Sequence, residues 1–300
     1  MSSDTAQTRV RHKQSIWATP RKVVVSPTGL IGTFIVVVFF LTAALAPVIA
    51  PHNPNLQRPA SRLLPPGSED IEGNFFLLGT DNLGRDMLSR IMYGARVSVL
   101  VGVSAVLVAG AIGVTLGLVA GYFGDPIDAI LGRIVDSFIA FPGLLLALVL
   151  AGVLGPGTTT VILVLGITNW VIYARVIRAE VLSLREREFV EAAHALGQRD
   201  HFILAKHVLP NVIPSYIVLA TLNVADTIIA EAALSFLGLG VQPPVVSWGQ
   251  MLAAGRSYVA TSWWLATIPG LAITVVVLGI ILMGDRLRDV LDPRMKGRST

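Results

Sequence analysis

The segment EAAHALGQRDHFILAKHVLP, residues 191–210, is a short polar stretch between two long apolar runs. Its apolar residues before Gly197 recur at helical spacing, and glycine commonly ends a helix. Asp200 is a residue type that caps the start of a helix, and Pro210 suits the first turn of a longer one. The segment therefore predicts a helix, a turn at Gly197, a second short helix and then a long apolar helix.

The composition of the chain indicates a membrane protein. Only 14% of its 300 residues are charged and its mean hydropathy is +0.70, whereas soluble domains carry about 25% charged residues. There is no cysteine, which excludes a disulfide framework, a thiolate metal site and a cysteine nucleophile. The net charge of +4 does not indicate nucleic acid, because most Lys and Arg residues flank apolar runs.

Six apolar runs are long enough to cross a bilayer, which takes about 20 residues. They lie near 29–50, 96–121, 129–154, 159–183, 211–237 and 264–284. In lipid such runs form helices, because every backbone polar group needs an internal partner. We expect an all-α integral membrane protein of six transmembrane helices. Its predicted parts are an N-terminal tail (1–28), a first span with an external segment (29–95), a core of five spans (96–285) and a C-terminal tail (286–300).

The positive charges predict the orientation. With six spans, 17 of the 23 Lys and Arg residues fall on the side that carries both tails and segment 191–210. Because cytoplasmic loops carry the excess of positive charge, both termini and this segment are expected to be cytoplasmic. The loop at 188–207 is longer than the roughly 2–8 residues that a helix connection needs, which favours a docking platform.

The same segment resembles the EAA loop of ABC importer permeases, a family pattern of EAA, three residues, Gly, nine residues, Ile, one residue and Leu-Pro. His207 stands at the Ile position, a variant that resembles the peptide and nickel branch of the family. In that family the loop is a coupling helix that seats in a groove of the ATP-hydrolysing subunit. The positions that correspond to the pattern are Glu191, Ala192, Ala193, Gly197, His207, Leu209 and Pro210.

Three further segments resemble the C-type subunits of dipeptide and oligopeptide permeases, and the resemblance covers about 29–295. They are 77–99, the stretch from Glu231 to Trp248-Gly249, and Ala140-Phe141-Pro142 in the third span. In the first of them we expect a short interfacial helix that carries Asp86, Arg90 and Arg96.

The resemblance implies a type I ABC importer in the bacterial cytoplasmic membrane. Its partners would be a second, B-type permease subunit, two ABC ATPase subunits, an extracytoplasmic substrate-binding protein, a peptide substrate and membrane lipid. The chain has no G-x-x-x-x-G-K-[ST] motif, so ATP and Mg would be bound by the ATPases and the chain itself would need no cofactor. The alternative substrates are nickel chelates, glutathione or another small peptide-like solute.

Charged residues inside the spans are candidates for the translocation path, because a carboxylate in a membrane faces protein or water. Asp226 and Glu231 are the two candidates, since a carboxylate could meet the ammonium group of a peptide. The alternative is structural hydrogen bonding. Asp136 has a possible partner in Arg133, three residues earlier on the same helix face.

Gly113, Gly117 and Gly121 form a ribbon of glycines along the second span, which favours close approach of another helix. Such an interface is either static or moving. Pro142 and Pro269 are expected to kink the third and sixth spans.

Other classes of protein fit the sequence less well. His194, His201 and His207 lack the spacing of metal ligands, so we expect no metal site. An intramembrane protease would need a serine with a base or paired aspartates, and neither pattern occurs. A secondary transporter would need internal repeats, which are not evident, and would not need an EAA-like loop.

Overall fold

A computed structural model describes residues 26–291 of the chain, and the outer parts of both predicted tails lie outside these residues. Five of its helices are long and apolar enough to cross a membrane, or six if one bent pair counts as a single span. The helices, 3-10 turns and one π segment (η3) are α2 (Pro27–Ile49), η2 (Pro59–Ser61), α3 (Met87–Phe123), α4 (Ile127–Ile139), α5 (Gly143–Leu154), α6 (Thr158–Arg185), α7 (Glu188–Ala195), α8 (Asp200–Ile203), η3 (Leu204–Val208), α9 (Leu209–Phe236), α10 (Trp248–Gly255), η4 (Arg256–Tyr258) and α11 (Trp264–Leu291).

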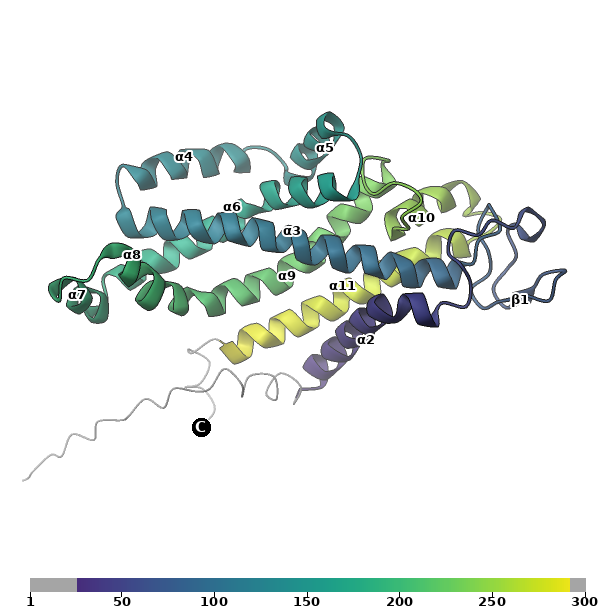
Figure 1. The fold of residues 1–300 in the computed structure, drawn as a ribbon, viewed down its shortest axis with the longest axis horizontal. Helices are drawn as coiled ribbons and strands as arrows, with labels where there is room; N and C mark the ends of the chain where they lie inside the picture. Colours follow the sequence, from purple (N-terminus) through teal and green to yellow (C-terminus); the bar gives the residue numbers. More distant parts are fainter. Residues whose placement is uncertain (1–25, 292–300) are drawn as a thin grey trace, which may run out of the picture.

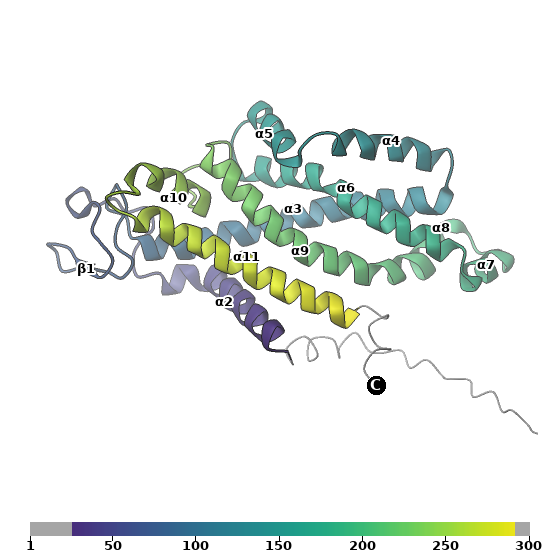
Figure 2. The ribbon, with the colours of Figure 1, turned by 180° about the vertical axis from the view of Figure 1, so that it is seen from behind.

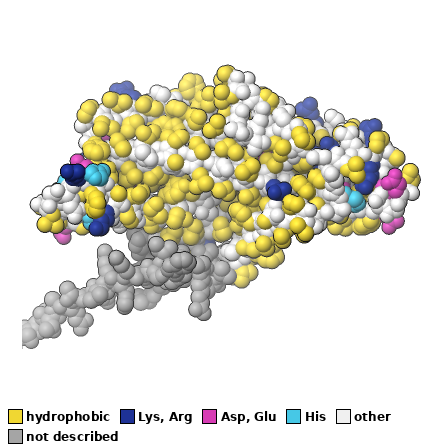
Figure 3. Space-filling model, viewed as in Figure 1, with side chains coloured by type: hydrophobic (Ala, Val, Ile, Leu, Met, Phe, Trp, Pro, Cys, Tyr) yellow, Lys and Arg dark blue, Asp and Glu magenta, His cyan; other side chains and the backbone are white. Residues whose placement is uncertain are grey.

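The long helices form an elongated bundle. Figures 1 and 2 show α3 running through most of its length, with α6 and α9 beside it and with α2 and α11 packed together below them. The short helices α7 and α8 lie at one end, and the external segment with α10 lies at the other end. Figure 3 shows that charged side chains gather at both ends of the bundle and that the surface between them is mainly hydrophobic.

The third predicted span is two helices rather than one kinked helix. α4 and α5 are bent by 86° at the break between them, which holds Ala140, Phe141 and Pro142. Proline has no N–H to donate to the preceding turn, and it disfavours helical geometry at the residue before it. Pro142 accordingly lies before the first turn of α5 with an extended ψ of 122°.

The helix α3 begins nine residues before the predicted second span, so the expected separate interfacial helix is wrong. Asp86 caps its first turn, where its carboxylate accepts from the Ser89 N–H at 2.9 Å and the Ser89 hydroxyl at 2.6 Å. Arg90 and Arg96 belong to this same continuous helix. A helix of 37 residues is about 55 Å long, which exceeds the roughly 30 Å hydrocarbon core.

The glycine ribbon lies at the contact of α3 with α6. A methyl group on Gly117 would lie 2.7 Å from the Ala174 carbonyl oxygen, and one on Gly121 would lie 2.8 Å from the Val181 Cβ. Gly113 meets the backbone of Trp170 in the same way. The helices are therefore packed backbone to backbone, which confirms the expected close approach.

The external segment between α2 and α3 is mostly irregular and contains Pro51, Pro54, Pro59, Pro65 and Pro66, a residue type that disfavours regular structure. It contains a two-residue antiparallel pair, β1 (Ser68–Glu69) with β2 (Phe75–Phe76), in which Ser68 faces Phe76. Two buried tryptophan side chains donate hydrogen bonds to the external segment and to the start of α3. Trp264 donates to the Thr80 carbonyl at 3.1 Å, and Trp248 donates to the Ile91 carbonyl at 3.0 Å. Both tryptophans therefore pack inside the protein, whereas Trp263 is 54% exposed.

Candidate functional site

The segment between α6 and α9 forms a compact unit, hereafter the coupling unit, of residues 188–208. Its inner side is apolar and buried, and it includes Val190, Ala193 and Ile203. These side chains pack with Ile177 and Val181 near the end of α6. The coupling unit is therefore fixed to the bundle by a small hydrophobic core of its own, rather than being a loose connector.

Gly197 ends α7 in the manner that the sequence predicts. Its φ is +71°, a left-handed conformation that costs other residues free energy because of their Cβ. The Gly197 N–H donates to the His194 carbonyl at 2.9 Å, and the Gln198 N–H donates to the Ala193 carbonyl at 3.1 Å. This pair of bonds is the Schellman motif, and it sets the direction in which the chain enters α8.

Asp200 does not cap α8, so this expectation is wrong. It is the first residue of α8, and no side-chain cap bond is formed at the preceding residue, Arg199. Its carboxylate instead accepts a hydrogen bond from the Tyr122 hydroxyl at 2.9 Å. The Tyr122 hydroxyl also lies 3.0 Å from the His194 Nε2, which is 3.3 Å from the same carboxylate. Competition from this network explains why the carboxylate leaves the helix end.

Tyr122 thus ties the last turn of α3 to both helices of the coupling unit. Its ring also stacks on the His194 ring, with the ring centroids 6.0 Å apart. The hydroxyl, imidazole and carboxylate come from three elements, α3, α7 and α8. These contacts connect α7 and α8 to α3 as well as to α6.

The chain passes from α8 into α9 through the π segment η3, which the sequence pattern does not reveal. His207 lies in it, and its Nε2 is 3.1 Å from the Gln198 side-chain oxygen. Leu209 and Pro210 then begin α9, with Pro210 in its first turn as predicted. Single turns of π helix are frequent at functional sites, and this one lies directly at the root of the coupling unit.

The outer face of α7 is small and apolar at its centre. Ala192, Ala195 and Leu196 are exposed, and Leu196 is 80% exposed. Phe189 and Phe202, exposed by 42% and 51%, flank them, and Glu191 lies on the same exposed surface. An exposed apolar patch of this kind, surrounded by charge, is typical of a protein interface.

The two candidate carboxylates of α9 are in different environments. Asp226 is exposed in the chain, next to the exposed Ile229. Glu231 is fully buried and accepts a hydrogen bond from the Ser235 hydroxyl at 2.7 Å. Glu231 therefore faces no open surface in this structure. Of the two interpretations, translocation path or structural hydrogen bonding, the geometry favours structural hydrogen bonding. Asp226 stays a candidate for the path.

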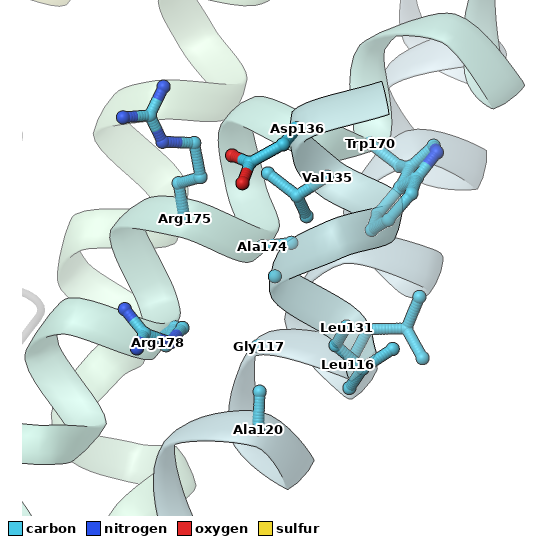
Figure 4. Close-up of a pocket in the computed structure, with 11 residues that line it drawn as sticks. Leu116, Gly117, Ala120, Leu131, Val135, Asp136, Trp170, Ala174, Arg175 and Arg178 are labelled. Atoms are coloured by element: carbon cyan, nitrogen blue, oxygen red, sulfur yellow. The ribbon is translucent and has the colours of Figure 1, made fainter. Parts of the chain in front are cut away.

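Asp136 lines a cavity of about 280 Å³ between α3, α4 and α6, shown in Figure 4. Arg175 and Arg178 of α6 line the same cavity. No ion pair between Asp136 and Arg133 is found in residues 26–291, so that expected pairing is not seen. Arg178 of α6 pairs with Asp128 at the start of α4: its Nε and Nη2, which form one edge of the guanidinium, donate to the two carboxylate oxygens, and this arrangement holds α4 against α6.

Across residues 26–291, no group of three or more His, Cys, Asp or Glu side chains is arranged to hold a metal ion. His194 and His207 have the separate partners described above, and His201 lies on the exposed side of α8. The coupling unit combines a buried apolar inner side, a turn at Gly197 and an exposed face of small apolar residues.

Comparison with known proteins identifies this arrangement. Residues 113–297 match the family model of the binding-protein-dependent transport system inner membrane component. The chain belongs to this family. Residues 21–66 also match the N-terminal transmembrane domain of oligopeptide transport permease C. The first match contains the coupling unit and the second contains α2, and residues 67–112, which include most of α3, lie between the two matches.

Curated relatives are similar over nearly their whole length. The dipeptide transport system permease protein DppC of Escherichia coli (strain K12) is 45% identical over 271 residues, 89% of each chain. A di/tripeptide transport system permease protein DppC of Pseudomonas aeruginosa is 41% identical over 269 residues, also 89% of each chain. A putative peptide transport system permease protein of Brucella suis is 40% identical over 284 residues, 95% of this chain and 94% of that one.

A solved structure supports the fold. The MetNI methionine ABC transporter, in an inward-facing conformation, has a chain that matches with a TM-score of 0.55 at 19% identity. The match covers 68% of this chain and 97% of that chain. The helical core with its coupling unit is therefore the type I importer permease fold. The chain is a transport permease component rather than an enzyme.

Proposed function

We propose that this chain is the C-type permease subunit of an ATP-driven importer of di- and oligopeptides in the bacterial cytoplasmic membrane. The observation that carries the proposal is the coupling unit, with its exposed alanine and leucine face held on a buried root. Relatives named as dipeptide and di/tripeptide permeases support the choice of substrate. Nickel chelates, glutathione and other small peptide-like solutes are the alternative substrates.

In the proposed mechanism the exposed face of α7 docks on an ABC ATPase subunit. Closure of two ATPases around ATP and Mg would displace the coupling unit as a rigid body. Because its core includes α6 side chains and Tyr122 bonds it to α3, the displacement would reach both helices. The consequence is a change of tilt that opens the path between this subunit and a B-type permease partner.

The substrate would arrive from an extracytoplasmic binding protein at the opposite end of the bundle, near the external segment. Asp226 is the candidate residue of the path in this chain, since it is an exposed carboxylate on a membrane helix and could meet a peptide ammonium group. The excess of positive charge near α7 and in the tails supports cytoplasmic termini.

The experiment that tests the proposed function is uptake of labelled peptides of two to five residues in three strains. The strains lack the chain, carry it unchanged, or carry Gly197→Asp. We expect uptake to be lost on deletion and rescued only by the unchanged chain. Unchanged peptide uptake on deletion, with loss of nickel uptake in the same strain, would assign the alternative substrate instead.

A further inference from the structure

A groove of about 580 Å³ lies on the surface of the bundle between α2, α3 and the loop that precedes α10. Its walls are mostly apolar, with Phe40, Ala43 and Ala44 from α2 and Leu100 from α3. The polar side chains that line it are Asn55, Tyr93 and Arg96. The groove is therefore mostly apolar, and Arg96 is the one charged side chain among the described residues that line it. Neither the coupling unit nor Asp226 contributes to it.

The depth of the groove follows from its place on α2. Phe40 lies nine residues before the end of α2 that meets the external segment, which corresponds to about 13 Å along a helix. The α2 helix carries no charged residue. In the orientation proposed above, the groove lies at the level of the outer leaflet of the bilayer, with its upper end near the lipid headgroups.

Arg96 differs from the other arginine near the start of α3. Arg90 is buried, donates to the Pro54 carbonyl at 3.1 Å and lies 3.6 Å from the Asp81 carboxylate. Arg96 is exposed, and within residues 26–291 no ion pair or hydrogen bond engages its guanidinium. A cation at this depth is costly unless an anion or water meets it.

The guanidinium of Arg96 is directed toward the headgroup level. It lies over the ring of Tyr93, one turn nearer the external segment, at 5.8 Å from the ring centroid. Arginine side chains near the ends of membrane helices extend in this way toward the interface, and tyrosine rings gather there. Guanidinium groups bind phosphate oxygens through paired N–H donors.

We propose that this groove binds one phospholipid molecule of the outer leaflet. Its phosphate is held by Arg96, with the Asn55 amide and the Tyr93 hydroxyl as further donors at the mouth of the groove. One acyl chain lies against Ala43, Ala44 and Leu100. The charge of Arg96 selects this occupant over a purely apolar helix of a partner, because a phosphate neutralises it and an apolar helix does not.

The absence of native cysteine makes a direct test possible. Leu100→Cys, labelled with bimane, is placed in the assembled importer complex in nanodiscs of phosphatidylglycerol whose acyl chains are brominated. We expect at least a twofold quenching of its fluorescence, and no quenching of the same label at Ile71→Cys, which lies 89% exposed in the external segment.

The other possible occupants give different results in the same complex. Modification of Leu100→Cys by a water-soluble methanethiosulfonate, with protection by peptide, would place the groove in the aqueous path and overturn the proposal. Absence of both quenching and modification would indicate that the partner permease covers the groove. This result would also overturn the lipid proposal.

The role of the charge is tested by native mass spectrometry of the complex released from phosphatidylglycerol nanodiscs. We expect Arg96→Gln to retain the lipid about tenfold less than the unchanged chain, because one charge-assisted contact is lost. Arg96→Lys should retain most of it. Arg256→Gln, an exposed arginine elsewhere, controls for net charge. Equal retention by Arg96→Gln would contradict the phosphate contact, and the quenching test decides the proposal even where that variant does not assemble.

Discussion

At the scale of single residues, the coupling unit depends on one backbone conformation and one exposed side chain. Gly197 adopts a left-handed conformation, and a methyl group added to it would meet no other atom within 4 Å. Any effect of substitution there therefore comes from backbone conformation and charge rather than from a clash. Leu196, its neighbour, is 80% exposed in the described part of the chain.

Gly197→Asp and Gly197→Asn separate these two contributions. Both side chains have nearly the same shape, and asparagine is tolerated at this position of a helix end. A negative charge at a helix C-terminus is unfavourable by about 0.3–1 kcal/mol. We expect Gly197→Asn to keep most peptide-stimulated ATP hydrolysis and transport, and Gly197→Asp to hydrolyse ATP without transport. Equal transport by both variants would contradict the coupling role.

Leu196→Glu should weaken the binding of the ATPase subunits without affecting the fold. An exposed residue contributes little to stability, whereas truncation of an interface anchor costs about 2 kcal/mol or more. Co-purification of the ATPase with the permease, at fixed expression, measures the effect. Ile71→Glu, an equally exposed apolar residue at the opposite end, is the control and should leave the ATPase bound.

At the scale of secondary-structure elements, two contacts hold neighbouring helices against α6, the helix that leads into the coupling unit. The glycines of α3 bring α3 into backbone contact with α6, and the Asp128–Arg178 ion pair holds α4 against α6. The apolar run of the second span and the four-residue spacing of its glycines are visible in the sequence. The close contact of α3 with another helix could therefore be predicted. The right-angle break at Pro142 could not, because a proline only removes one bond and the neighbouring helices decide the size of the bend.

Gly117→Leu should separate α3 from α6. Side chains forced into a packed interface typically cost about 1–3 kcal/mol, and here a Cβ alone would lie 2.7 Å from the Ala174 carbonyl oxygen. We expect a lower thermal unfolding midpoint of the purified complex and reduced transport. Gly152→Leu in α5 is the matched control, since a Cβ there meets no atom within 4 Å. An unchanged midpoint for Gly117→Leu would show that the two helices separate readily.

At the scale of the whole molecule, the bundle has a coupling end and an external end on opposite sides of its apolar helices (Figures 1 and 3). The external end is fixed by long-range contacts such as Trp264 with Thr80 and Trp248 with Ile91. The coupling end is fixed by Tyr122 and by the apolar root. In the proposed mechanism the two ends bind different partners, and the helices between them transmit the movement.

The orientation of these ends is tested with single cysteines in the otherwise cysteine-free chain. An impermeant maleimide added to intact spheroplasts should label Ile71→Cys and should not label Leu196→Cys. After the membrane is permeabilised in a strain without the ATPase subunits, which would otherwise cover Leu196, both should react, because both side chains are more than three-quarters exposed in the chain, at 89% and 80%. Labelling of Leu196→Cys in intact spheroplasts would reverse the proposed topology.

The sequence by itself determined five of the membrane helices, the turn at Gly197 and the family, because these depend on local composition and spacing, but it did not determine that the third predicted span is two helices bent by 86°. Only the tertiary structure decided which carboxylate of α9 is exposed and which is buried, and where Asp200 finds its partner. The physical reason is that α9 is apolar around most of its circumference, so its own pattern does not fix its rotation. Contacts from distant elements fix it, and they likewise place Tyr122 against His194 and Asp200.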